Sequence, residues 1–218
     1  MALSLNLADI RKSYTQQELS EDNIRNNPFN QFEAWLQEAL DAQAAEPTAM
    51  VLSTVSSAGK PSARVVLLKA LEHGQFVFFT NYNSRKGTDL DQNSFAALTF
   101  FWPELERQIR IEGQVEQVSA TISDTYFQSR PRGSQIGAWV SPQSQAVENR
   151  QALEKVTAEF RQKFGEEAPI PRPPHWGGYG LTPTYVEFWQ GRPNRLHDRL
   201  VFTRESSKDN WQLSRLAP

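Results

Sequence analysis

Two arginines flank a histidine in the segment Arg195-Leu196-His197-Asp198-Arg199, near the end of the 218-residue chain. Apolar and aromatic residues precede and follow the segment, which predicts an extended strand. Because side chains alternate between the faces of a strand, Arg195, His197 and Arg199 would share one face. Two guanidinium groups favour the neutral imidazole, and a bound anion or electron-rich ring would relieve their repulsion. The alternative is a solvated face on which Asp198 and other carboxylates pair with the arginines.

A second cationic cluster, Asn83-Ser84-Arg85-Lys86, opens a short polar helix predicted over residues 84–92. Asn83 or Ser84 can cap this helix. The free amides of a helix N-terminus, its positive dipole end and two cations form a natural phosphate site. The alternative is a capped surface helix whose two cations are solvated.

Arg64 and Lys69 lie at the two ends of an apolar segment with the character of a strand. Their separation of five residues places them on opposite faces of a regular strand. Unless a bulge intervenes, one of them lies on the inner side of the sheet, where a cation needs an anionic partner. The alternative is that both charges reach water at the strand ends.

Tyr126 and Arg130 are spaced four residues apart on a predicted helix, and Ser134 follows shortly after. A phenol, a guanidinium and a hydroxyl that converge at a helix end can bind a second anion. A structural stack of tyrosine and arginine is the alternative. The next segment, residues 135–144, is apolar and closed by polar donors, which suits either the edge of a heterocycle or the packing of a loop.

Composition limits the classes of function. The chain has 23 Lys and Arg against 25 Asp and Glu, a net charge of −2, which argues against a nucleic-acid partner. It has no cysteine and only three widely spaced histidines, so we expect neither disulfides nor a protein metal site. No run approaches the roughly 18 apolar residues of a membrane span, and we expect a cytoplasmic location. Walker, Rossmann and nucleophile-elbow motifs are absent, so nucleophilic hydrolysis has little support. Several cationic sites of phosphate size, many aromatic residues and one well-placed histidine favour a bound organic cofactor.

Hydrophobic periodicity predicts the order of the elements. A polar N-terminal arm with a short helix, residues 1–28, precedes a single domain, residues 29–218. This domain would begin with a helix over about 28–45, and its mostly β character with added helices is an α+β class. An antiparallel meander of strands is expected to close into a small barrel. We expect strands near 50–55, 63–69, 76–80, 95–102, 108–115, 184–190, 196–204 and 210–215, and further helices near 119–129 and 147–164.

In combination, these segments closely resemble the pyridoxine (pyridoxamine) 5′-phosphate oxidases. The resemblance implies an antiparallel FMN-binding split β-barrel and a homodimer with two sites at the subunit interface. It also implies oxidation of pyridoxine or pyridoxamine 5′-phosphate to pyridoxal 5′-phosphate, with O2 as acceptor. The segments that carry it are Arg64-Val-Val-Leu-Leu-Lys69, Ser84-Arg85-Lys86, Glu106-Arg107-Gln108, the run from Tyr126 to Ser141, Glu187-Phe-Trp-Gln-Gly191, Arg195-Leu-His-Asp-Arg199 and Arg215-Leu-Ala-Pro218.

The same resemblance implies roles for individual residues. Arg195 and His197 would flank the pyridine ring as the catalytic pair, and Arg11 and Tyr14 would form a lid over the substrate. The substrate phosphate would bind Lys69, Tyr126, Arg130 and Ser134. FMN would bind Arg64, Val65, Val66, Leu67, Lys69, Phe79, Thr80, Arg85, Lys86, Gln108, Gln143, Ser144, Trp189 and Arg199.

Three positions depart from the family pattern. Phe79 stands where a tyrosine is often found, Gly133 replaces a common acidic residue, and Arg192-Pro193-Asn194 is an unusual approach to Arg195. These departures bear on substrate preference more than on activity. Two other functions fit the same barrel: a non-catalytic FMN or pyridoxal-phosphate binding protein, and an NAD(P)H-dependent flavin reductase.

Overall fold

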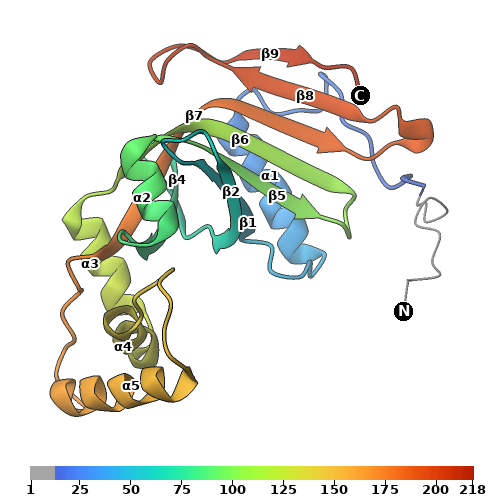
Figure 1. Cartoon of the computed structure of the whole chain (residues 1–218). Helices are drawn as coiled ribbons and strands as arrows, with labels where there is room; N and C mark the ends of the chain where they lie inside the picture. Colours follow the sequence, from blue (N-terminus) through green and yellow to red (C-terminus); the bar gives the residue numbers. More distant parts are fainter. Residues whose placement is uncertain (1–12) are drawn as a thin grey trace, which may run out of the picture. The chain divides into compact units, whose positions relative to one another are not determined.

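The computed structural model describes residues 13–218, which form a mainly β structure with helices (Figure 1). The elements follow the chain in the order α1 (Pro28–Asp41), β1 (Ala49–Val55), β2 (Pro61–Leu67), β3 (Ala70–Glu72), β4 (Gln75–Asn81), α2 (Arg85–Gln92), β5 (Phe95–Trp102), β6 (Arg107–Gln117), α3 (Ala120–Ser129), α4 (Arg132–Val140), α5 (Arg150–Phe164), β7 (Trp176–Gln190), a 3-10 turn (Pro193–Arg195), β8 (Asp198–Thr203) and β9 (Gln212–Arg215). Within this part of the chain, no helix has the length and apolar character needed to cross a membrane.

The strands are hydrogen-bonded in the order β2-β1-β5-β6-β7-β4-β3, and β8 adds to β7 and β9 to β8. The long strand β7 pairs with two antiparallel strands, one along each part of its length. Its first part pairs with β4, with Phe76 opposite Leu181, and its last part pairs with β8, with Val186 opposite Phe202. The expected antiparallel split-barrel fold is confirmed, but the simple meander is wrong, because β4 pairs with β7 and not with the next strand along the chain.

The chain folds into two compact units, each built from segments that are separated in the sequence. The first contains residues 1–47, 99–111 and 185–218. Helix α1 begins here because Asn27 accepts a hydrogen bond from the Phe29 amide and Pro28 occupies the first turn. Its apolar face buries Phe32 against Phe100, 5.0 Å between ring centroids, and Trp35 against Phe188 at 5.2 Å. This face provides much of the core of the first unit.

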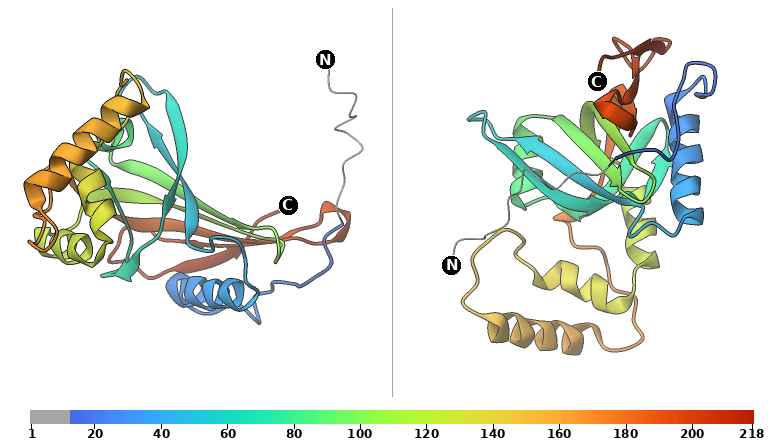
Figure 2. Two further views of the ribbon diagram at one scale, coloured as in Figure 1. Left: turned by 90° about the horizontal axis from the view of Figure 1, so that it is seen from below. Right: turned by 90° about the vertical axis from the view of Figure 1, so that its right-hand side faces the viewer.

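The second unit contains residues 48–98 and 112–184. Strands β1 and β2 form a hairpin, with Leu52 opposite Arg64. Helices α4 and α5 lie side by side in both views of Figure 2. A buried cluster of Phe127, Ile136, Ile170 and Trp176 fixes α3 and α4 against the start of β7.

Helix α4 and the short strand β3 were not expected from the sequence. Helix α4 covers part of the apolar segment 135–144, which was expected to contact a heterocycle or pack a loop, and β7 begins at Trp176, eight residues before the expected start. Glycines weaken the strand pattern of this segment. Gly178 is required because a Cβ there would lie 2.8 Å from the Phe79 ring.

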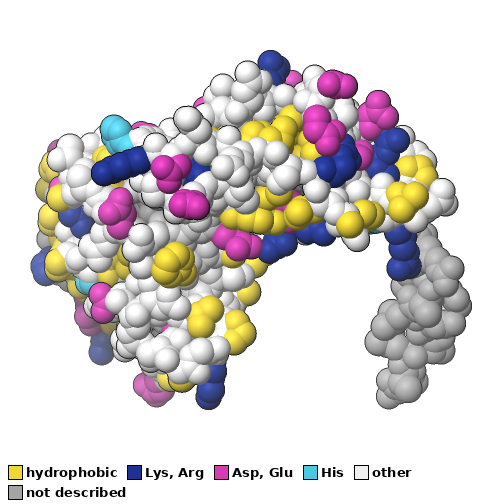
Figure 3. Space-filling model, turned by 90° about the horizontal axis from the view of Figure 1, so that it is seen from above, with side chains coloured by type: hydrophobic (Ala, Val, Ile, Leu, Met, Phe, Trp, Pro, Cys, Tyr) yellow, Lys and Arg dark blue, Asp and Glu magenta, His cyan; other side chains and the backbone are white. Residues whose placement is uncertain are grey.

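Other boundaries also differ from expectation. Helix α1 ends at Asp41 and not near residue 45, and residues 13–27 contain no helix. The segment around His197 is only partly extended, since Arg195 belongs to the 3-10 turn and β8 begins at Asp198. On the face drawn in Figure 3, acidic and basic side chains are interspersed, in keeping with the small net charge.

Candidate active site

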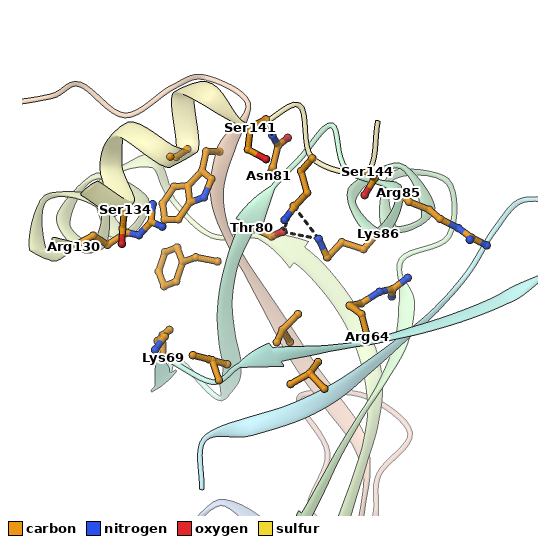
Figure 4. Close-up of a pocket in the computed structure, with 18 of the residues that line it drawn as sticks. Arg64, Lys69, Thr80, Asn81, Arg85, Lys86, Arg130, Ser134, Ser141 and Ser144 are labelled. Carbon is orange, nitrogen blue, oxygen red and sulfur yellow. Dashed lines mark hydrogen bonds between the residues drawn. The ribbon is translucent and has the colours of Figure 1, made fainter. Parts of the chain in front are cut away.

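A cavity of about 750 Å³ opens in the second unit (Figure 4). Its charged lining residues are five cations, and no carboxylate is among the described residues that line it. Figure 4 shows the cations in two groups on opposite sides of the cavity. Arg64, Arg85 and Lys86 form one group, which we call the helix-α2 group; Lys69 and Arg130, with Ser134, form the other, the helix-α3 group.

Lys86 is the most buried cation of the helix-α2 group, with 8% of its surface exposed. Ser84 caps α2, as expected, by accepting a hydrogen bond from the Gly87 amide. Lys86 Nζ donates to Thr80 Oγ1 at 3.0 Å, to Ser84 Oγ at 3.1 Å and to Gln143 Oε1 at 3.0 Å. Burial, and then the positive charge of Arg64, lower the pKa of Lys86 to about 8. A buried ammonium with three neutral acceptors favours an anion nearby.

Arg64 reaches the same side of the cavity from β2. Its Nη1 donates to Leu52 O at 3.1 Å and to Thr54 Oγ1 at 2.8 Å, and Asp89 lies 3.9 Å from Nη2. Burial lowers the pKa of Arg64, and the negative charge of Asp89 partly offsets this decrease. The expectation that Arg64 and Lys69 occupy opposite faces is wrong. Strand β2 ends at Leu67, so its alternation does not extend to Lys69, and both residues line the cavity.

Three aromatic rings form the wall beside the helix-α3 group. Tyr126 stacks on Phe79, 3.9 Å between centroids, and both rings are nearly parallel to Trp176. The Arg130 guanidinium lies 4.5 Å over the Trp176 ring. Its Nη1 atom is buried and makes no hydrogen bond within residues 13–218. Burial lowers the pKa of Arg130. A buried donor without a partner is costly, and an anion in the cavity would satisfy it.

His197 belongs to the first unit and lies in an aromatic environment. Its ring centroid lies 4.7 Å from that of Trp189 and 5.7 Å from that of Tyr14. The Arg192 amide donates to His197 Nδ1 at 3.1 Å, so the neutral ring carries its proton on Nε2. Burial, followed by the positive charge of Arg195, lowers the pKa of His197. The sequence-based expectation of a neutral imidazole therefore agrees with the structure.

The two arginines beside His197 have different environments. Asn194 and Arg195 have φ angles of 57° and 64°, left-handed conformations that asparagine tolerates better than most residues. Arg199 is not a free cation: its Nε and Nη2 atoms donate to Glu187 at 2.9 Å and 3.0 Å. Asp198 pairs instead with Arg215 at 2.7 Å. A single strand face carrying all three cations is therefore not formed.

The sequence-predicted residues divide between the two units. The cavity brings together Arg64, Val65, Val66, Leu67, Lys69, Phe79, Thr80, Arg85, Lys86, Tyr126, Arg130, Ser134, Gln143 and Ser144. Tyr14, Gln108, Trp189, Arg195, His197 and Arg199 lie in the first unit. Arg11 lies outside the described residues.

Sequence reasoning did not single out Trp176, Ser62 or Asn81, which also line the cavity. Trp176 stands at the start of β7, directly after a proline-rich connection. Its one available signal was an aromatic residue preceding two glycines, which is not specific. Gly133, a departure from the family pattern, has nothing within 4 Å of an added Cβ. Packing therefore does not explain the missing acidic residue.

Comparison with known proteins shows the family. Residues 36–164 match the pyridoxamine 5′-phosphate oxidase family, and residues 176–218 match the pyridoxine 5′-phosphate oxidase C-terminal dimerisation region. The pyridoxine/pyridoxamine 5′-phosphate oxidase of Cytophaga hutchinsonii is 55% identical over 99% of this chain and 100% of its own length. The oxidase of Salinibacter ruber is 56% identical over 97% of this chain and 99% of its own length.

Solved structures agree on the fold. PhzG from Burkholderia lata 383, in complex with tetrahydrophenazine-1-carboxylic acid, has a TM-score of 0.86 at 30% identity, over 95% of this chain and 100% of that chain. A pyridoxamine 5′-phosphate oxidase-related, FMN-binding protein from Nostoc punctiforme has a TM-score of 0.66 at 18% identity, over 93% and 100%. The chain belongs to the pyridoxine/pyridoxamine 5′-phosphate oxidase family of FMN-dependent oxidoreductases.

Proposed function

We propose that this protein oxidises pyridoxine 5′-phosphate and pyridoxamine 5′-phosphate to pyridoxal 5′-phosphate, with FMN as cofactor and O2 as electron acceptor. The alcohol and O2 give the aldehyde and H2O2; the amine, O2 and water give the aldehyde, NH3 and H2O2. The observation that carries the proposal is the cavity with two separated groups of cations and no acidic lining residue among those described. Two cationic groups suit a phosphorylated cofactor and a phosphorylated substrate held together.

The helix-α2 group fits the phosphate of FMN. The capped N-terminus of α2 supplies the positive end of a helix dipole, and Arg64, Arg85 and Lys86 supply charge. Thr80 and Gln143, which accept from Lys86, hold its ammonium toward the cavity. FMN held by these residues would supply the hydride acceptor for the substrate carbon and the route by which two electrons reach O2.

The helix-α3 group fits the substrate phosphate. Arg130 offers its Nη1 atom, which has no hydrogen-bond partner among the residues that the structure describes, and Lys69, Tyr126 and Ser134 line the same part of the cavity. An anion bound here would restore the hydrogen bond that this buried donor lacks. Fixing the phosphate orients the rest of the substrate, so much of the rate enhancement would come from position.

Arg195 and His197 are the proposed catalytic pair. The neutral His197 donates a hydrogen bond from Nε2 to the substrate, and Arg195 stabilises the negative charge that develops as the substrate hydroxyl or amine gives its proton to water. Both residues lie within the match to the dimerisation region, residues 176–218. The proposal therefore includes a homodimer with active sites at the subunit interface. It also includes residues 1–28 as a lid on a single FMN-binding domain, residues 29–218.

The test is an aerobic assay of the FMN-loaded protein with pyridoxine 5′-phosphate and pyridoxamine 5′-phosphate. Pyridoxal 5′-phosphate and H2O2 should form in equal amounts. Tetrahydrophenazine-1-carboxylic acid, the ligand bound to PhzG, serves as a comparison substrate. Bound FMN without either product would favour a non-catalytic binding protein, and bleaching of the flavin by NAD(P)H would favour a reductase.

A further inference from the structure

Two residues that the proposed function does not use lie where the chain passes from β5 to β6: Glu106 ends the turn and Arg107 begins β6. Both belong to the run Glu106-Arg107-Gln108 that resembles the oxidases. Both are buried, with 2% and 3% of their surface exposed. Buried charged groups need partners, and here the partners come from a distant part of the sequence.

Glu106 binds the backbone of the N-terminal arm within the first unit. Its Oε2 atom accepts hydrogen bonds from the amides of Thr15 at 2.9 Å and Gln16 at 3.2 Å. The two residues lie 91 and 90 positions away in the sequence. A carboxylate that accepts two successive amides fixes both the path and the direction of the arm.

Arg107 binds the next residue of the arm and joins it to two other elements. Its Nη2 atom donates to the side chain of Gln17. Its Nη1 donates to Glu38 of α1 at 2.7 Å and its Nε to Gln190 of β7 at 2.9 Å. The guanidinium also lies 4.3 Å over the Trp35 ring. Glu106 and Arg107 thus hold three consecutive residues of the arm.

This anchor determines where Tyr14 lies. The ring centroid of Tyr14 lies 5.7 Å from the ring centroids of both Trp189 and His197, and the contact with each is edge-on. It also lies against Gly191, where an added Cβ would approach the Tyr14 side chain to 2.7 Å. The Gly191 amide donates to Glu106 O at 2.8 Å. Glu106 therefore holds both Tyr14, through the adjacent amides, and the glycine against which Tyr14 packs.

We propose that Glu106 is a positioning residue of the oxidase, which acts by holding Tyr14 against His197 and Trp189, with Arg107 as a second anchor. This inference rests on the proposed function, because its kinetic effect is on oxidation of the phosphorylated substrate. If the arm loosens, the His197 ring loses its edge-on contact with Tyr14 and is held less firmly in the substrate site.

The first experiment combines kinetics with hydrogen exchange on the FMN-loaded enzyme. In Glu106→Gln and Glu106→Ala, kcat/KM for pyridoxamine 5′-phosphate should fall, by about tenfold for alanine, because charge-assisted hydrogen bonds to backbone amides are lost. Glutamine should retain more activity than alanine, because its amide oxygen still accepts. The Thr15 and Gln16 amides should exchange slowly in the wild type and rapidly in Glu106→Ala, and FMN content should not change.

Glu104→Gln is the matched control. Glu104 lies in the same turn and accepts a hydrogen bond from the Ala45 amide at 3.3 Å, so it does not hold the arm at Tyr14. This variant should leave kcat/KM and the exchange of Thr15 and Gln16 unchanged. Gly191→Ala displaces Tyr14 without touching the Glu106 carboxylate, and should lower kcat/KM as Glu106→Ala does.

A double-mutant cycle with Tyr14→Ala decides whether Glu106 acts through Tyr14. If it does, Glu106→Ala, which should cost about tenfold in the wild type, should change kcat/KM by less than about twofold in the Tyr14→Ala background. Equal effects in both backgrounds would overturn the proposal. So would wild-type amides of Thr15 and Gln16 that exchange as fast as in Glu106→Ala. An inactive wild type would instead refute the proposed function, and the exchange measurement would then report separately on the anchor.

Discussion

Lys86 Nζ lies 3.0 Å from Gln143 Oε1 and joins the first turn of α2 to the segment that follows α4. Lys86 donates to Thr80, Ser84 and Gln143, and among residues 13–218 no carboxylate pairs with its charge. Its pKa, about 8, is low because of burial and then Arg64. Lys86 is thus poised to gain from a phosphate and to lose its proton in moderately alkaline solution.

FMN binding should consequently weaken in alkaline solution. A bound phosphate raises the pKa of Lys86 above its value of about 8 in the free protein, so binding requires protonation there once the pH exceeds 8. The Kd should rise by up to about tenfold per pH unit between this value and the higher pKa of the complex. Fluorescence quenching of FMN from pH 7 to 9.5 measures it. Lys86→Arg should remove this rise, and identical pH profiles would contradict the role of Lys86.

Arg130→Gln should weaken the binding of phosphorylated substrates and leave FMN bound. Loss of a charge-assisted contact predicts a decrease of about 10- to 100-fold in kcat/KM for pyridoxine 5′-phosphate. Turnover of unphosphorylated pyridoxine, however slow, should change much less. The exposed Lys155→Gln serves as a control for a lost surface charge. An equal loss for both substrates would show that Arg130 does not bind the phosphate.

Oxidation should depend on the neutral form of His197. Burial and Arg195 lower the pKa of this ring below its ordinary 6.5, so the neutral form predominates at pH 7 and above. As the pH falls, protonation breaks the hydrogen bond from the Arg192 amide to Nδ1, and kcat should decline. His197→Asn should have a lower kcat without this acid limb. A wild-type kcat that shows no decline at any acid pH at which the enzyme stays folded would exclude the assignment.

Glu187 should stabilise the first unit by pairing with Arg199 and Arg110. Burial raises the pKa of Glu187, but hydrogen bonds from Arg199 and Tyr185 and the charges of Arg199 and Arg110 outweigh it, and the net shift is downward. Its stabilisation is therefore present above pH 4.5 and is lost as the pH falls through the folded-state pKa. Glu187→Gln should lower the free energy of unfolding by about 3 kcal/mol at pH 7.

The difference between wild type and Glu187→Gln should shrink in acid, as urea unfolding at pH 7 and pH 3.5 would show. Glu154→Gln removes an exposed partner of Arg150 and is the matched control, for which little change is expected at either pH. A Glu187→Gln deficit that is the same at both values would mean that packing, and not the ion pairs, accounts for its stability.

Local sequence signals were sufficient for several features of the site. Ser84 caps α2 and so places Arg85 and Lys86 in the first turn of the helix. Capping can be read from the sequence because it depends on residues within one helical turn. The direction of the pKa shift of His197 was predicted from its arginine neighbours, but burial is the larger cause and only Arg195 of the two arginines contributes. The family, and with it FMN and the phosphorylated substrates, was identifiable from ordered motifs along nearly the whole chain.

Tertiary structure alone decided how these pieces combine. Lys69 shares the cavity with Arg64 because β2 ends at Leu67, a boundary set by pairing with β1 rather than by the apolar run itself. Trp176 lines the cavity and stacks on Phe79, and Gly178 leaves room for the Phe79 ring. Glu187 pairs with Arg199, 12 positions away in the sequence. Glu106 binds the Thr15 amide of the arm, 91 positions away. Sequence periodicity describes neighbours along one element, whereas the partners of buried charges come from whichever elements the fold places beside them.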